Sequence, residues 1–357
     1  MNFGLYNWRE QLIYAASAFI TQLINSGRDP KKIFFQNILF IKDDEIGDLC
    51  YSIPVFEMIK KQFPDCKTTL LCKPFAKPLV QSDPHLDRII TEWDQLDKNE
   101  KYDLLVELRG TWKSNRYALK SLPKYRVDRG TVKLKNKFSG KRLHESEINF
   151  KIVEQIISPQ NKSLTPHLFT NSTDEQEAKH FLLANNLSHF AIMHTSTRKE
   201  LKKWPVDRFS KLALYLKEKH QLDIVFIGDK NDVDAINELQ GMISFSTYSA
   251  AGKLSLSALS ALVKQAAIYI GNDSGPLHIA ALNGTPSLGL YGPVAPGVFY
   301  PPVKNAVVMH KVLPCNPCNQ INCVHPDNPC IQRITLEEVI IKAEELILQH
   351  ASKEVSG

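Results

Sequence analysis

The sequence has little that would let it cross a membrane. The uncharged run over residues 11–27 contains Gln, Ser, Thr and Asn side chains, and the run over residues 274–303 is broken by five glycines and six prolines. Polar groups and helix breakers at this density disfavour a transmembrane helix. The N-terminus lacks a basic leader, and the small residues Ala16-Ser17-Ala18 follow too short an apolar stretch for a secretory signal. We therefore expect a cytoplasmic protein.

Several other classes of protein are also excluded. The seven cysteines are an odd number, which argues against a disulfide framework in a reducing compartment. No short repeat or low-complexity segment is present, and 43% hydrophobic with 23% charged residues is an ordinary globular composition. The length of 357 residues, at about 150 residues per domain, predicts two domains.

Two nucleotide-binding motifs are missing. No Gly-Lys-Ser/Thr run occurs, and no Gly-x-Gly-x-x-Gly fingerprint follows an expected strand. These motifs place phosphates in P-loop proteins and in dinucleotide-dependent dehydrogenases, so neither class is favoured.

What is present is an uneven distribution of charge. The formal net charge is +6, yet residues 113–142 hold eleven basic residues against one acid, Asp128. That stretch carries +10 and the remainder −4. A concentrated basic segment attracts phosphate groups, whether of a nucleic acid, a lipid or a phosphorylated sugar.

Strand and helix patterns alternate along most of the chain. Short apolar runs at residues 37–42, 68–72, 88–90, 103–108, 190–194, 223–228, 267–270 and 287–290 predict strands. Helices are expected between them, including 49–63, 206–219 and a closing helix over 336–349. This order predicts an α/β protein of two doubly wound, Rossmann-like domains that face a cleft. The polar, proline-flanked stretch 158–166 is the expected linker.

The N-terminal segment is expected to be helical. Apolar side chains recur every three or four residues at Leu5, Trp8, Leu12, Ala15, Phe19 and Leu23, and Gly27 and Pro30 end the pattern. We expect this stripe to pack on the body of the protein, and the alternative is a helix lying on a membrane surface. The expected organisation is an extension over 1–32, domains over 33–160 and 161–334, and a C-terminal helix over 335–357.

Three loops that follow strands carry candidate functional groups. In the first, Gly47 permits a tight turn before Asp48, which either caps the next helix or accepts a proton from a substrate hydroxyl. In the second, Ser196, Thr197 and Lys202 are suited to phosphate, although a solvated loop would also explain them.

The third loop is the most specific. Asp273, Ser274 and Gly275 join a strand to a helix that begins with Pro276. Free backbone N–H groups and the helix dipole at such a turn favour an anion, and Asp273 is placed for a sugar hydroxyl. The alternative is a capped turn with His278 on the packed side of the helix.

A cluster of four thiols lies near the C-terminus, at Cys315, Cys318, Cys323 and Cys330. Four thiols in sixteen residues are suited to tetrahedral zinc or iron. Only one Cys-x-x-Cys pair is present, so reduced structural thiols remain the alternative.

Five ordered motifs resemble those of the heptosyltransferase family, glycosyltransferase family nine. They are residues 38–42 through Ile46-Gly47-Asp48, residues 102–110 with Lys113-Ser114, Lys202-Lys203-Trp204-Pro205 with Arg208-Phe209, residues 272–278, and Gly292-Pro293 followed by the cysteines. The resemblance covers residues 38–347. It implies the glycosyltransferase-B fold and an inverting transfer from a nucleotide sugar that needs no metal.

The resemblance also assigns roles to residues. Asp48 matches the general base, and Lys202 matches a lysine beside the donor phosphates. The donor site is implied at Ser196, Thr197, Asp232, Asp273, Ser274, Gly275 and His278. The acceptor side is implied at Gly47, Arg109 and Lys113, in the domain that holds the basic segment.

The function expected from the resemblance is transfer of heptose from ADP-heptose to a lipopolysaccharide-core or similar anionic acceptor. That acceptor implies a peripheral contact with the inner face of the inner membrane, and no nucleic acid partner is expected. The alternatives are another nucleotide-sugar enzyme on the same fold, such as an epimerase, and a metal-organised protein that binds nucleic acid.

Overall fold

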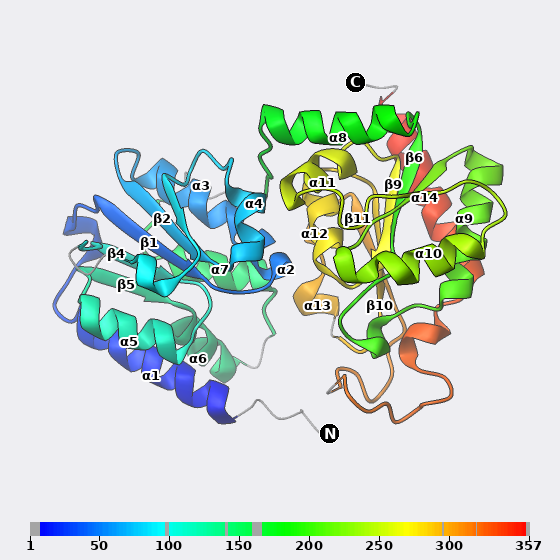
Figure 1. Ribbon diagram of the computed structural model, residues 1–357. Coiled ribbons are helices and arrows are strands. Elements are labelled where there is room, and N and C mark those ends of the chain that lie inside the picture. The colour runs from blue at the N-terminus through cyan, green and yellow to red at the C-terminus, as the bar shows by residue number, and fades with distance from the viewer. Residues whose placement is uncertain are drawn as a thin grey trace. The chain divides into compact units, whose positions relative to one another are not determined.

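The computed structural model describes residues 8–96, 100–139, 142–158, 166–294, 296–318 and 320–354. It divides into two units, Met1–Phe169 and Thr170–Gly357, each built around its own sheet (Figure 1). Most of the expected linker, residues 159–165, falls outside the described residues. In the described part of the chain, no helix is long and apolar enough to cross a membrane.

The first unit contains a parallel sheet in the order β3-β2-β1-β4-β5. Its strands are β1 (Asn37–Lys42), β2 (Lys67–Cys72), β3 (Arg88–Ile90), β4 (Leu104–Glu107) and β5 (Tyr125–Asp128). The four strands predicted for this half are confirmed. The edge strand β5 was not predicted, because its Arg126 and Asp128 resemble surface residues in the sequence but are buried in the structure.

Helices cover this sheet on both faces. They are α1 (Trp8–Asn25), α2 (Ile46–Cys50), α3 (Ile53–Gln62), α4 (Lys77–Val80), α5 (Trp112–Ser121), α6 (Arg129–Ser139) and α7 (Glu145–Val153). The prediction of one helix over residues 49–63 is wrong, since the chain forms α2 and α3 with a break at Tyr51 and Ser52. Pro54 in the first turn of α3 explains the break, because proline lacks the N–H that would continue a preceding helix.

The N-terminal extension forms α1, but the expected packing of its apolar stripe is wrong. The side buried against the unit consists of Ser17, Ile20, Thr21 and Ile24, whereas Trp8, Leu12, Phe19 and Leu23 are exposed. Polar contacts select this orientation. The Ser17 hydroxyl donates to Asp128, and the amide of Asn25 exchanges two hydrogen bonds with the Arg126 backbone.

The second unit has a six-stranded parallel sheet in the order β11-β10-β9-β6-β7-β8. The strands are β6 (Phe190–His194), β7 (Asp223–Phe226), β8 (Tyr248–Ser249), β9 (Ile268–Asn272), β10 (Ser287–Tyr291) and β11 (Ala306–His310). The strands predicted for this half, β6, β7, β9 and β10, are confirmed. The short β8 and the half-buried β11 were not predicted.

The α-helices described in the second unit are α8 (Ser172–Ala184), α9 (Val206–His220), α10 (Val233–Gly241), α11 (Leu256–Val263), α12 (Gly275–Leu282), α13 (Pro296–Phe299) and α14 (Leu336–Glu354). Two apolar cores lie against the sheet. One joins α9, α10 and α14, and the other joins α8, α11 and α12. Each unit is therefore a parallel sheet enclosed by helices, as the alternation of patterns predicted.

Candidate active site

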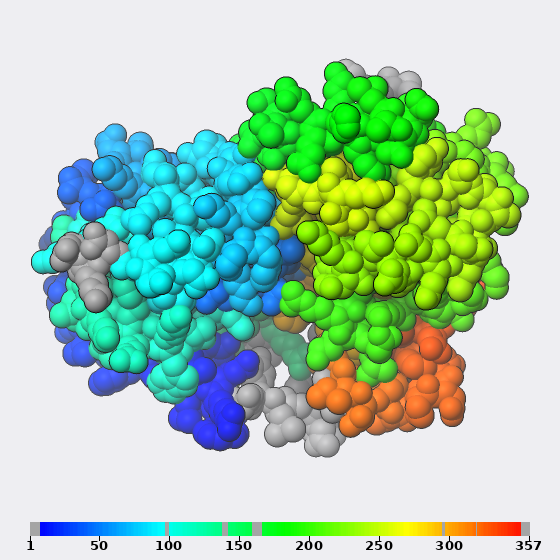
Figure 2. All heavy atoms as spheres, in the orientation of Figure 1, coloured from blue at the N-terminus to red at the C-terminus, as the bar shows by residue number. Residues whose placement is uncertain are grey.

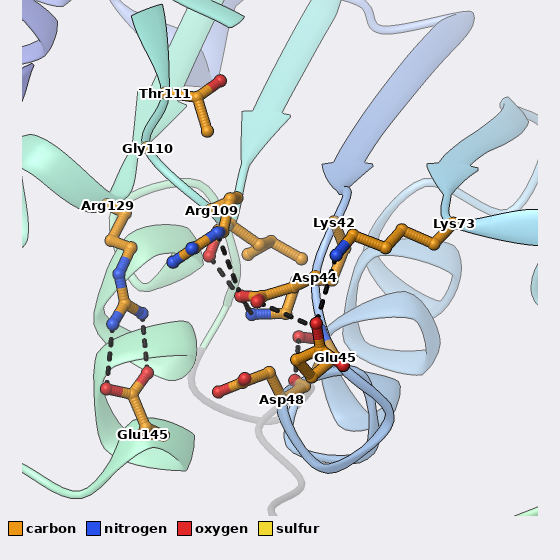
Figure 3. Close-up of polar contacts among 12 residues, drawn as sticks. Lys42, Asp44, Glu45, Asp48, Lys73, Arg109, Gly110, Thr111, Arg129 and Glu145 are labelled. Carbon is orange, nitrogen blue, oxygen red and sulfur yellow. Dashed lines mark hydrogen bonds and ion pairs between the residues drawn. The ribbon is translucent and has the colours of Figure 1, made fainter. Parts of the chain in front are cut away.

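The first group of site residues lies where β1 ends and α2 begins. Residues 43–45 form the connection, and Asp48 lies in the first turn of α2, one residue after Gly47 (Figure 3). Because the carboxyl ends of parallel strands share one edge of the sheet, the turn after β4 lies beside this loop. Asp48 is half-buried, so its carboxylate is partly withdrawn from water.

The surroundings of Asp48 change its acidity. Burial raises its pKa from 3.8 to about 6, with further increases from the negative charges of Asp44 and Glu145. The positive charges of Lys42 and Arg129 act in the opposite direction. At neutral pH the group is therefore mainly ionised, and it is a stronger base than an ordinary aspartate.

A buried ion pair fixes the loop that precedes Asp48. Lys42 is 1% exposed, and its Nζ lies 3.3 Å from Asp44 Oδ2 and 3.4 Å from the Leu108 carbonyl oxygen. Arg109 Nε lies 3.4 Å from the same oxygen of Asp44. Asp44 thus links the loop after β1 to the turn after β4, and it holds the Arg109 side chain at the edge of the sheet where Asp48 also lies (Figure 3).

The turn after β4 is organised by Glu107, whose buried carboxylate accepts hydrogen bonds from the N–H groups of Arg109 and Gly110. Gly110 has a φ of +80°, a conformation that favours glycine. Thr111 then caps α5, where Lys113 lies with its Nζ 5.0 Å from the centre of the Trp93 ring. Lys113 therefore contacts the Trp93 ring, whose Nε1 donates to Asp43 of the loop after β1 at 3.4 Å.

A second buried ion pair lies near Asp48 and was missed in the sequence. Arg129 in α6 donates two hydrogen bonds, of 2.7 and 2.8 Å, to the carboxylate of Glu145 in α7. The guanidinium holds the pKa of Glu145 well below its usual range, and the carboxylate raises the pKa of Arg129. The sequence offered one weak signal, a glutamate three positions after Arg142, the last residue of the basic run.

This pair corrects the view of residues 113–142 as one basic surface. Arg126 is 0% exposed and donates to Asn115 and Ser17, and Arg129 is also buried. Lys124 and Lys133 are paired with Asp103 and Glu145. Part of the apparent excess of positive charge is therefore neutralised by hydrogen-bonded or ion-paired partners, as a buried cation requires, and does not belong to an open basic surface.

The second group of site residues belongs to the other unit, around the turn from β9 to α12. Lys202 Nζ lies 2.6 Å from Asp273 Oδ2, so two residues that the sequence placed in separate motifs form an ion pair. Both side chains are largely buried, at 17% and 9% exposure. Lys202 comes from a single 3₁₀ turn over Glu200–Lys202, which gives its ammonium group a defined position beside the β9–α12 turn.

Asn272 connects this turn to the loop after β6. Its side chain accepts the N–H of Trp204 at 3.0 Å and donates to the Thr195 carbonyl oxygen at 2.7 Å. Ser196 and Thr197 follow Thr195 directly and are half-buried. The loop of Ser196 and Thr197 is thereby fixed to the turn that contains Asp273, Ser274 and Gly275.

Ser274 and Gly275 lie at the N-terminal end of α12. Ser274 precedes the helix, and its Oγ lies 3.0 Å from Nδ1 of His194. Burial lowers the pKa of His194 to about 4, so the ring is neutral at physiological pH. His278 in the same helix is buried, at 4% exposure.

Asp232 lies after β7, on the same edge of the sheet. Its carboxylate accepts the N–H of Asp229 at 2.8 Å, and its negative charge acts on His194. A side chain at Gly228 would come within 2.7 Å of Asp232, so glycine is required for this approach. The second unit thus brings Lys202 and the predicted donor residues of the three loops to one edge of its sheet, whereas His278 is buried within α12.

The four cysteines of the C-terminal cluster line one small cavity of about 20 Å³, together with His325. Cys330 is buried, which raises the pKa of its thiol, and the other three are half-buried. Among the described residues, no group of three or more Cys, His, Asp or Glu is arranged to hold a metal ion. The thiols share a cavity without forming a preassembled metal site.

Comparison with known proteins gives consistent matches. The family described as glycosyltransferase family 9 (heptosyltransferase) matches residues 93–327. The lipopolysaccharide core heptosyltransferase OpsX of Haemophilus influenzae is 21% identical over 277 residues, covering 72% of this chain and 79% of the relative.

Solved structures match in fold. The family 9 glycosyltransferase of Veillonella parvula has a TM-score of 0.76 at 20% identity, covering 89% of this chain and 99% of that one. The ADP-heptose LPS heptosyltransferase II of E. coli has a TM-score of 0.70 at 18% identity, covering 88% of this chain and all of that one. These matches confirm the prediction of two Rossmann-like units of the glycosyltransferase-B type.

Proposed function

The chain belongs to glycosyltransferase family 9, and from this premise we propose that it transfers heptose from ADP-heptose to an anionic acceptor of the lipopolysaccharide-core type. The observation that carries the proposal is the family match over residues 93–327. The similarity to enzymes named for lipopolysaccharide core and for ADP-heptose supports this choice of acceptor and donor.

We assign the general base to Asp48. Its position after β1 and its pKa of about 6 support this role. In an inverting transfer, the acceptor hydroxyl attacks the anomeric carbon from the side opposite the departing diphosphate. Asp48 accepts the hydroxyl proton as the new C–O bond forms, a step that typically contributes about 10²–10⁴-fold.

The departing ADP is assigned to the second unit. The Lys202 ammonium group, the hydroxyls of Ser196 and Thr197, and the N–H groups at the start of α12 are suited to a diphosphate. Asp273 holds Lys202 in place, so the positive charge is oriented before the leaving group develops its negative charge. No metal is required in this scheme.

Four further residues complete the proposal. Asp232 is assigned to the ribose hydroxyls and His278 to the donor side. Arg109 and Lys113 are assigned to the anionic acceptor, because both are cations close to the Asp48 loop. An acceptor of this kind is lipid-linked, so the proposed site of action is the cytoplasmic face of the inner membrane, with the protein bound peripherally.

We further propose that the thiols of the cysteine cluster close around a structural zinc or iron ion, although the described residues are not prearranged as a metal site. The support is that Cys315, Cys318, Cys323 and Cys330 line one cavity, and thiolates are preferred ligands of both metals. Elemental analysis of protein purified without chelator is expected to give about one metal ion per chain. A metal-free protein with the same thermal stability as the untreated protein would contradict this role.

The transfer is tested by mass spectrometry of a lipopolysaccharide-core acceptor after incubation with purified protein and ADP-heptose. The expected result is a gain of one heptose with release of ADP. Parallel reactions with ADP-glucose and UDP-glucose test the donor. Transfer from one of these sugars, with none from ADP-heptose, would overturn the donor assignment but retain the family activity.

A further inference from the structure

One face of α1 is apolar and exposed. Trp8, Leu12, Phe19 and Leu23 are exposed to between 51% and 68%, and their spacing of four, seven and four residues places them on one side of the helix. No charged residue occurs between residues 11 and 25 of this helix. Contiguous exposed apolar side chains of this size mark an interaction surface.

The outward orientation of this face is fixed rather than incidental. The opposite side of α1 is held by the hydrogen bond of Ser17 to Asp128, at 2.7 Å, and by the two bonds of Asn25 to Arg126. Ile20 and Ile24 on that side join the apolar core of the first unit. Rotating α1 to bury the aromatic residues would break all of these contacts, so the apolar face stays available to a partner.

Basic side chains border the apolar face on both sides. Lys137 of α6 donates to Gln11, at 2.7 Å, and Arg28 donates to the carbonyl oxygens of Pro123 and Lys124. On the other flank, α5 contacts α1 through the hydrogen bond from Asn115 to the Ile13 carbonyl oxygen. The exposed basic residues of α1, α5, α6 and the segments that adjoin them are Arg9, Arg28, Lys31, Lys32, Lys113, Arg116, Lys120, Lys124, Lys135 and Lys137, against the exposed acids Glu10 and Asp29.

This combination fits the surface of a lipid bilayer. An interfacial helix buries its apolar face at the boundary between headgroups and acyl chains, and flanking lysines and arginines contact anionic headgroups. Figure 1 shows α1 at the outer side of the first unit with α5 and α6 alongside, and the atoms of α1 reach the surface in the space-filling view (Figure 2). We propose that the Trp8–Leu12–Phe19–Leu23 face of α1 docks the protein on an anionic membrane.

The basic border favours an anionic membrane over a second copy of the chain as the partner of this apolar face. In a two-fold dimer through the same face, the basic border of one copy would approach the basic border of the other. Repulsion between like charges opposes that contact, whereas an anionic bilayer attracts the same border. The proposal names the surface for the peripheral membrane contact of the proposed function, and it does not depend on sugar transfer, because none of the four apolar residues of this face belongs to the candidate active site.

The test is co-sedimentation of the full chain with vesicles of phosphatidylcholine, with and without phosphatidylglycerol. The wild-type protein is expected to bind the anionic vesicles and to be released by high salt. Replacing Phe19 and Leu23 with serine should lower the partition coefficient by about 10–100-fold, because two large apolar groups no longer leave water.

Two controls make the result specific. Leu183→Ser removes an equally exposed leucine from α8 of the second unit and should leave vesicle binding unchanged. Because Phe19 and Leu23 are exposed, their replacement should not lower the unfolding temperature, which circular dichroism checks. Lys135→Glu with Lys137→Glu should weaken binding to anionic vesicles only.

Equal vesicle binding by the wild-type protein and the Phe19→Ser/Leu23→Ser variant would overturn the proposal. A wild-type dimer that becomes a monomer in this variant, measured by sedimentation velocity, would assign the face to a second copy instead. A water-soluble acceptor distinguishes a loss of membrane docking from a loss of sugar transfer. The Phe19→Ser/Leu23→Ser variant should transfer sugar to this acceptor at the wild-type rate.

Discussion

Replacing Asp48 with asparagine should stabilise the protein while removing its activity. The folded protein raises the pKa of Asp48 from 3.8 to about 6, so it binds the proton more tightly than the unfolded chain does. Protonation of Asp48 therefore adds to the free energy of unfolding. This contribution is fully present below pH 3.8 and is lost as the pH rises through about 6. Asparagine is neutral at every pH and so avoids this loss.

The expected size of the effect follows from the two pKa values. The difference between 3.8 and about 6, at about 1.4 kcal/mol per pKa unit, corresponds to about 3 kcal/mol at most. Asp48 is half-buried and its carboxyl interacts with Lys42 and Arg129, so a gain of about 1–3 kcal/mol is expected above pH 7. Below pH 4 the gain should vanish.

Urea unfolding at a series of pH values, monitored by tryptophan fluorescence, measures this gain in the free energy of unfolding. Trp8, Trp93 and Trp112 lie in the first unit, so the signal reports chiefly on the unit that contains Asp48. Asp65→Asn, which removes an exposed carboxylate of the same unit, is the control and should change stability by less than about 0.5 kcal/mol. A loss of stability in Asp48→Asn at pH 8, or a gain that is the same at pH 4 and pH 8, would refute the reasoning.

Three further perturbations test other parts of the structure. The kcat/KM of the wild-type protein should rise with pH through about 6 and then level, because only ionised Asp48 accepts a proton; a profile flat from pH 5 to pH 8 would exclude this role. Lys202→Ala should lower kcat/KM by about 10²-fold or more and weaken ADP binding in calorimetry, whereas unchanged ADP affinity would move the diphosphate elsewhere. Arg129→Met should cost about 2–4 kcal/mol in urea unfolding because the buried Glu145 loses its two short hydrogen bonds and keeps only the longer contact with Lys133 among those that the structure describes, and adding Glu145→Leu should recover most of the loss.

The fold could be predicted from the sequence because most strands are short apolar runs. Strands such as β1 and β6 are buried on both faces and leave a continuous hydrophobic pattern. The edge strand β5 has no such pattern. Its charged residues are buried through partners distant in sequence, such as Ser17 for Asp128, and a local pattern cannot reveal these partners.

The same limit applies to α1 and to the site. The 3.6-residue period predicted a helix, but the direction of its apolar face depends on Ser17 and Asn25, whose polar contacts lie about 100 residues away in the chain. The motifs located Asp48 and Lys202. They gave no sign of the Arg129–Glu145 pair, or that Lys202 is paired with Asp273, because both facts depend on tertiary contacts.

The most direct test of the central claim is a single-turnover measurement with Asp48→Asn, ADP-heptose and a lipopolysaccharide-core acceptor. The variant is expected to bind ADP-heptose with the affinity of the wild-type protein, because Asp48 lies outside the unit assigned to the donor. Heptose transfer by the variant is expected to fall by at least about 10²-fold. Transfer at the wild-type rate by this variant would contradict the assignment of Asp48 as the general base.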